Sequence, residues 1–121
     1  MADDLTRLNT LGLRSVADRL VEIRQLSDLA RWYERHGGAP VTVLGGGSNV
    51  VLRGRLTGSV LLMRNRGLAL EAAGDGIALL TAAAGERWND VVRFALGQGY
   101  AGLENLALIP GCAGAAPIQN I

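Results

Sequence analysis

The sequence contains no lysine, a single cysteine (Cys112) and a single histidine (His36), and aromatic residues make up only 4% of its 121 residues. Without lysine, the chain can form neither a Schiff base nor a phosphate-binding loop of the kind that depends on a lysine. One cysteine and one histidine cannot supply the ligands of a structural zinc site, so we expect no metal site. A lone cysteine also cannot form an internal disulfide, which is typical of proteins in a reducing compartment.

An excess of charge of one sign and a long apolar run are also missing. The formal net charge is +1, with 12 basic residues, all of them arginine, against 11 acidic ones. This balance argues against nucleic-acid binding, which usually requires a clustered basic face. No apolar run approaches the roughly 18 residues that cross a bilayer, and the polar start of the chain does not resemble a signal peptide. We therefore expect a cytoplasmic protein with no membrane partner and no nucleic-acid partner.

The first half of the chain predicts two or three strands and one helix. Residues 15–25 are interpreted as a strand, although neither parity of their alternation is consistently apolar. Ser27 is expected to cap a helix that ends at Gly37-Gly38. The apolar runs Val41–Leu44 and Ser59–Met63 are typical of buried strands.

The second half predicts a hairpin and a helix. Two apolar runs flank Asp75-Gly76, a dipeptide that favours a tight hairpin turn. Residues 87–98 show a helical period, with the apolar positions Trp88, Val91, Val92, Ala95 and Leu96 on one face. The order of elements favours an α+β fold, with two small lobes that meet near residues 64–68.

Three successive glycines follow the Val41–Leu44 strand, in the stretch Gly45, Gly46, Gly47, Ser48 and Asn49. One interpretation is a flexible turn. The other is a backbone that approaches a phosphate closely, because successive N–H groups without side chains can line an anion-binding concavity. A G-x-G-x-x-G match at residues 97–102 follows a helix instead of a strand, so we do not expect a Rossmann-type dinucleotide site.

A second unusual stretch covers residues 109–121, where small residues and prolines dominate and no charge occurs. Such a backbone can pass close to a flat ring or a pyrophosphate, and Gln119 and Asn120 offer amide groups. An ordinary buried loop is the alternative interpretation. His36 is expected to be a cation at a helix C-terminus or a solvated side chain, and Cys112 and Trp88 to be packing residues. Glu86 and Asp90 are expected to be solvated carboxylates instead of a catalytic pair.

Four stretches carry a shared pattern: NTLGL at residues 9–13, LGGGSNVVL at 44–52, AGERWND at 84–90, and GLENLALIPG from residue 102 running on to Ile121. Together they resemble the UDP-N-acetylenolpyruvoylglucosamine reductase family, also called UDP-N-acetylmuramate dehydrogenase, over nearly the whole chain. Leu11 departs from the pattern, because an aromatic residue is usual there.

The resemblance implies an α+β, vanillyl-alcohol-oxidase-type (PCMH-type) FAD-binding fold, in which two subdomains hold FAD between them. Residues 1–66 would form a complete first subdomain and residues 67–121 the start of a truncated second one, with the substrate domain absent. FAD is the implied cofactor, with NADPH as the reductant. The implied FAD-binding residues are Gly45, Gly46, Gly47, Ser48, Asn49, Pro110, Gly111, Gly114, Ala115, Pro117, Ile118, Gln119 and Asn120.

In the family, the flavin reduces UDP-N-acetylglucosamine enolpyruvate to UDP-N-acetylmuramate, a peptidoglycan precursor. The family's catalytic arginine, serine and glutamate are expected beyond residue 121, so we expect no catalytic residue here. The chain is thus interpreted as the N-terminal FAD-binding part of this oxidoreductase, which the resemblance suggests to be a monomer. Two alternatives stay open: a catalytically inactive truncated fragment, or part of another FAD-dependent oxidoreductase of the same fold.

Overall fold

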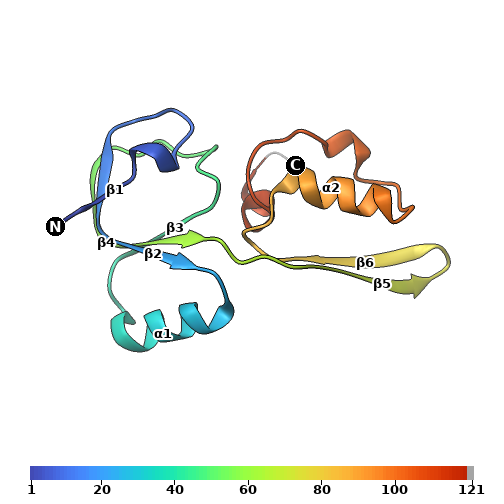
Figure 1. The fold of residues 1–121 in the computed structure, drawn as a ribbon, viewed down its shortest axis with the longest axis horizontal. Helices are drawn as coiled ribbons and strands as arrows, with labels where there is room; N and C mark the ends of the chain where they lie inside the picture. The colour runs from blue at the N-terminus through green and yellow to red at the C-terminus, as the bar shows by residue number, and fades with distance from the viewer. Residues whose placement is uncertain (120–121) are drawn as a thin grey trace.

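The computed structural model describes residues 1–119 and contains two lobes that lie side by side (Figure 1). The first lobe is built on a four-stranded sheet with the order β1-β2-β4-β3. Strand β1 pairs antiparallel with β2, whereas β2 and β3 both run parallel to the central β4. The strands and helices of this lobe are β1 (Asp3–Asp4), the 3₁₀ helix η1 (Thr6–Leu8), β2 (Ser15–Ile23), α1 (Leu26–His36), β3 (Val41–Leu44) and β4 (Gly54–Met63).

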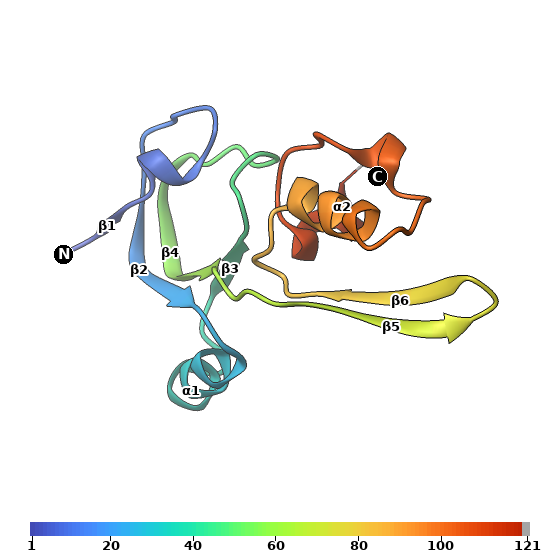
Figure 2. The ribbon, with the colours of Figure 1, turned by 45° about the vertical axis from the view of Figure 1, so that its right-hand side comes forward.

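The second lobe consists of a two-stranded antiparallel hairpin with a helix over one face (Figure 2). Its elements are β5 (Leu68–Gly74), β6 (Ile77–Ala82), α2 (Trp88–Gly97) and the 3₁₀ helices η2 (Glu104–Leu106) and η3 (Ala113–Ile118). The α+β class expected from the sequence is confirmed. Within residues 1–119, no helix is long and apolar enough to cross a bilayer.

Residues 59–62 of strand β4 are buried, because a core cluster covers each face of the sheet at this point. Val60 and Leu62 point to one face and Leu61 to the other, as the alternation of a strand requires. Leu61 packs with Ile23 and Trp32 beneath α1. The opposite face carries the larger core cluster, whose buried members are Leu5, Ala17, Leu44, Leu52, Val60 and Leu62.

Strand β2 owes its unclear alternation to a break in its pairing with β4. The register shifts between Ala17 and Arg19. Before the shift, Ala17 faces the larger core cluster; after it, Leu20 contacts that cluster while Val21 and Ile23 contact the cluster under α1. From the pair Ala17 and Leu56 to the pair Arg19 and Ser59, β2 advances by two residues and β4 by three, so the extra residue lies in β4. Such a bulge changes the parity of one strand relative to the other for all residues that follow. Residues 15–23 therefore form one strand with two successive alternation patterns.

The residue at this irregularity, Asp18, is bonded to the neighbouring strand. Its carboxylate accepts a hydrogen bond from the backbone N–H of Gly58 (2.9 Å) and forms an ion pair with Arg55 (2.6 Å). The Gly58 N–H, followed by the Arg55 guanidinium, lowers the pKa of the Asp18 carboxyl. The bulge is therefore fixed by a charged contact across 40 residues of sequence.

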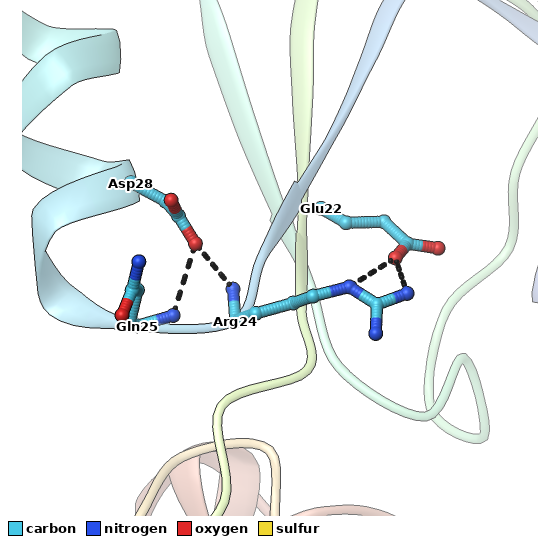
Figure 3. A network of polar contacts seen from close by, with 4 residues as sticks. All are labelled: Glu22, Arg24, Gln25 and Asp28. Atoms are coloured by element: carbon cyan, nitrogen blue, oxygen red, sulfur yellow. Dashed lines mark hydrogen bonds and ion pairs between the residues drawn. The ribbon is translucent and has the colours of Figure 1, made fainter.

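Helix α1 begins at Leu26, with Gln25 as its N-cap, so the expectation that Ser27 caps the helix is wrong. Figure 3 shows the reason: one carboxylate oxygen of Asp28 accepts the backbone N–H groups of Arg24 (2.9 Å) and Gln25 (3.0 Å). A carboxylate at the third helical position that reaches back to the cap residue is one half of a capping box. Asp28 therefore fixes the helix start two residues earlier than a Ser27 cap would.

The second lobe follows its sequence signals closely. Asp75 and Gly76 both have positive φ (52° and 74°), as a type I′ hairpin turn requires. Helix α2 buries Val91, Val92 and Ala95, but Leu96, expected on the same apolar face, is 43% exposed. The helix and the hairpin are not closely packed, because an apolar-lined cavity of about 590 Å³ lies between them.

Replacing Asp28 with alanine should destabilise the first lobe in a pH-dependent manner. Hydrogen bonds from Arg24 and Gln25, with the charge of Arg31, lower the pKa of Asp28 below its ordinary value of 3.8. A carboxyl whose pKa is lowered by folding stabilises the protein above its unfolded-state pKa, and this contribution is lost as the pH falls through the folded-state pKa. Urea unfolding should therefore show the wild type more stable than Asp28→Ala near neutral pH and the two converging in strong acid. An equal difference at both pH values would contradict this assignment.

Candidate functional site

The glycine loop, residues 45–49, leaves strand β3 and is packed against the N-terminal turn of the chain. A Cβ atom on Gly47 would overlap the carbonyl oxygen of Leu8 and lie 2.9 Å from the Cα atom of Asn9. Among the three successive glycines, only Gly47 has φ in the left-handed region (69°). The Gly47 carbonyl accepts the backbone N–H of Thr10 at 3.0 Å. The loop is therefore held in place, which excludes the interpretation as a flexible turn.

The other side of the glycine loop touches the facing segment, residues 110–119. A Cβ atom on Gly46 would lie 3.4 Å from the Cα atom of Gly111 and 3.6 Å from the Cys112 sulfur, and one on Gly111 would lie 3.0 Å from Ser48 Oγ. Two stretches about 60 residues apart in sequence thus approach with almost no side chain between them. They share a cavity of about 120 Å³, lined by Val43, Gly45, Gly46, Gly47, Ser48, Asn49, Val50, Ala115, Ile118 and Gln119.

Most residues that the sequence singled out are brought together, and some are not. All five of Gly45–Asn49 line the shared cavity, together with Ala115, Ile118 and Gln119. Gly111 lies at the contact between the two walls. Gly114 faces away, since a Cβ atom there would lie 2.6 Å from that of Ala84. Of the remaining positions, Pro110 and Pro117 are exposed outside the cavity lining, and Asn120 lies outside the described residues.

Backbone dipoles, not charged side chains, dominate the electrostatics of this cavity. Residues 44–52 and 105–119 contain no acidic or basic residue. In the part of the chain that the structure describes, the backbone N–H groups of residues 46–49 donate to no protein acceptor. Consecutive free N–H groups form a concavity of partial positive charge that suits an anion.

The facing segment is held by the loop between β6 and α2. Backbone hydrogen bonds join Ala113 to Glu86 (2.8 Å), Gly114 to Ala84 (3.0 Å) and Trp88 to Gly111 (3.0 Å). The Glu86 side chain, 12% exposed, accepts the N–H of Gly67 at 2.8 Å and pairs with Arg66 at 3.2 Å. The expectation that Glu86 is solvated is therefore wrong. Through these contacts, Glu86 links Arg66 and Gly67, which connect the two lobes, with the loop that supports the facing segment.

Sequence reasoning gave no role to Asn9, although the structure places it directly behind the glycine loop. Asn9 is 5% exposed, and its side chain makes hydrogen bonds to backbone groups of Leu5, Thr6 and Leu13. Its position in the stretch NTLGL was the only available signal. A side chain that bonds only to nearby backbone leaves no charge or metal-ligand pattern in the sequence.

Comparison with known proteins agrees with this geometry. The sequence model of one family, described as FAD binding domain, matches residues 17–121. The chain belongs to this FAD-binding domain family, FAD is accordingly its cofactor, and its fold is of the expected PCMH type. The crystal structure of UDP-N-acetylenolpyruvylglucosamine reductase from Thermus caldophilus is similar, with a TM-score of 0.63 and 25% sequence identity, and the match covers 96% of this chain and 41% of that one.

Curated relatives are similar over nearly the whole chain. UDP-N-acetylenolpyruvoylglucosamine reductase of Azoarcus sp. (strain BH72) is 50% identical over 124 residues, and that of Neisseria meningitidis serogroup B (strain ATCC BAA-335 / MC58) is 44% identical over 121. The matches cover 98% of this chain but only 36% and 35% of those proteins. The resemblance carried by the four motifs is confirmed, and the chain spans about a third of the length of the curated relatives it matches.

Adding one methyl group at Gly47 should destabilise the fold far more than adding it at Gly46. Alanine at position 47 would need a positive φ and would overlap Leu8. The free energy of unfolding of the Gly47→Ala variant should therefore be lower than that of the wild type by about 2 kcal/mol or more. Alanine at position 46 meets its nearest atom at 3.4 Å and should cost less than about 1 kcal/mol. Urea denaturation of both variants measures the difference. Equal losses would contradict the packing described for Gly47.

Proposed function

We propose that the chain forms the N-terminal, FAD-binding part of an NADPH-dependent flavoenzyme that reduces UDP-N-acetylglucosamine enolpyruvate to UDP-N-acetylmuramate. One observation carries the proposal: within residues 1–119, the N–H groups of residues 46–49 donate to no protein acceptor, and they lie beside a cavity whose opposite wall is the facing segment. The names of the relatives, whose sequences match nearly all of this chain, supply the reaction.

The glycine loop suits the pyrophosphate of FAD because it offers backbone N–H groups and few side chains that would keep a phosphate away. The pyrophosphate would accept hydrogen bonds from Gly46–Asn49, as anions do at concave arrays of backbone N–H groups. Gly45 has neither a positive φ nor a close neighbour, since a Cβ atom there would lie 3.7 Å from Cys112. Protein packing would therefore accept alanine at Gly45, whereas a close ligand favours glycine.

The apolar parts of FAD have a matching surface on the same walls. Val43 is 63% exposed and Ile118 is 81% exposed, and both line the cavity beside the glycine loop. Large apolar side chains exposed at a concave site are typical of ligand contact. Ala115 and Gln119, from the facing segment, complete this wall. We assign Pro110, Gly111, Gly114 and Pro117 to the segment that runs along FAD, and Asn120 follows them in sequence.

The two lobes correspond to different parts of the proposed enzyme. We assign residues 1–66 to the first FAD subdomain, because they contain the complete four-stranded sheet, and residues 67–121 to the start of the second.

FAD, when bound, supplies the hydride chemistry. Among residues 1–119, no titratable side chain lines the shared cavity. We assign the proton donor and the UDP-sugar site to the part of the relatives that this chain does not span. We place the enzyme in the cytoplasm, as a monomer.

The full chain should bind FAD, and Gly46→Val should weaken that binding by about tenfold or more. Valine at position 46 would push Gly111 and Cys112 away and so separate the two walls of the cavity. Gly97→Val is the matched control, because a Cβ atom at Gly97 meets nothing within 4 Å beyond the backbone of its own helix. Isothermal titration calorimetry measures the three dissociation constants. No FAD binding by the wild type, or equal weakening by both variants, would contradict the proposal.

The full chain loaded with FAD should not oxidise NADPH in a manner that depends on UDP-N-acetylglucosamine enolpyruvate. The physical reason is that a general acid must lie within hydrogen-bond reach of the reacting atom. The family's catalytic serine and glutamate are expected beyond residue 121, and among residues 1–119 the cavity lining contains no titratable side chain. Absorbance at the NADPH band, recorded with and without the enolpyruvyl substrate, provides the measurement. The Azoarcus relative serves as the positive control. Substrate-dependent oxidation by this chain would show that the catalytic groups lie within it.

A further inference from the structure

The turn before strand β2 is organised by one buried amide. Asn9 Nδ2 donates to the carbonyl groups of Leu5 and Thr6 (both 3.2 Å) and Leu13 (3.0 Å), while Asn9 Oδ1 accepts the N–H of Leu13 at 2.9 Å. These contacts satisfy both ends of the amide inside the turn. They also fix the path of the backbone on either side of Asn9, and thereby the position of Thr10.

Thr10 makes the link from this turn to the glycine loop. Its backbone N–H donates to the Gly47 carbonyl at 3.0 Å, and its hydroxyl lies 3.4 Å from the same oxygen. Gly47 has no Cβ that would keep the two segments apart. The strong part of the link is thus the backbone N–H of Thr10, with the hydroxyl as a weak second donor.

The link also sets the direction of the next N–H group. The carbonyl of Gly47 and the N–H of Ser48 belong to one peptide unit, and in a planar trans peptide they point in opposite directions. No peptide bond in residues 1–119 is cis. With the carbonyl bonded to Thr10, the Ser48 N–H points away from the N-terminal turn, on the side where Ser48 lines the shared cavity.

We propose that Thr10, held in place by Asn9, is a positioning residue for the FAD pyrophosphate: it fixes the Gly47–Ser48 peptide so that the Ser48 N–H is presented to the phosphate. The inference rests on the proposed function of the glycine loop. It assigns a binding role to the NTLGL stretch, which lies on the far side of the loop from the cavity.

The Thr10 N–H can be removed by a substitution that is compatible with the backbone conformation of Asn9. Asn9 has φ −131° and ψ 141°, which is the region preferred before proline. Thr10→Pro therefore deletes the N–H donor, while Thr10→Val, the conservative variant, keeps it and loses only the distant hydroxyl. Thr10→Pro should weaken FAD binding by about tenfold, and Thr10→Val by less than about twofold. Asp28→Ala is a control for lost stability alone, because α1 does not line the cavity.

Two NMR readouts separate positioning from a merely structural role. On titrating FAD into the isotope-labelled wild type, the Ser48 amide should shift strongly, whereas the Thr10 amide should stay protected from exchange. The phosphorus resonances of bound FAD should differ between Thr10→Pro and wild type but not between Asp28→Ala and wild type. If Thr10→Pro fails to fold, the wild-type Ser48 amide decides the question.

The outcomes distinguish this inference from the proposed function. A wild type that does not bind FAD refutes the proposed function. Binding by the wild type with an unmoved Ser48 amide, or with equal affinity in a folded Thr10→Pro variant, overturns the positioning role alone.

Discussion

The arrangement of the site depends on the close approach of two backbones, the turn at Leu8–Thr10 and the loop at Gly47. This contact exists because Gly47 carries no Cβ and because a backbone hydrogen bond of 3.0 Å joins Thr10 to Gly47. From this fixed point, Gly46 reaches Gly111 on the other lobe. The glycine loop is thus held between the N-terminal turn and the facing segment, and its N–H groups, which donate to no acceptor within residues 1–119, have a defined direction.

Elements with local sequence signals were predicted well. Three elements depend on residues that are close together in the sequence: the Asp75-Gly76 turn, the helix over residues 88–97 and the strand Val41–Leu44. Local sequence preferences predict such elements correctly where the tertiary contacts around them favour the same conformation. The glycine loop was also singled out from the sequence. Three adjacent glycines lose much conformational entropy on folding, and a simple turn needs only one.

Features that depend on distant contacts were missed or misplaced. The alternation of β2 was unclear because the register shift at Asp18 is fixed by Arg55 and Gly58, about 40 residues away. Gly114 was singled out for the cofactor, and the sequence did not show that its lack of a side chain also allows close packing against Ala84. Glu86 was expected in solvent, yet it holds the connection at Arg66 and Gly67. In each case the deciding partner lies outside the window that a local pattern covers.

Among residues 1–119, no arginine lines the shared cavity, so the site proposed for an anionic ligand offers backbone N–H groups instead of a charged side chain. Arg24, Arg31, Arg55 and Arg66 pair with Glu22, Asp28, Asp18 and Glu86, all outside the cavity lining. A neutral array of N–H groups attracts a pyrophosphate only where each dipole points at it, because no free charge can adjust its position. Geometry then matters more than charge for affinity. Residues that orient the loop from behind, such as Asn9 and Thr10, can therefore influence binding as strongly as residues that touch the ligand.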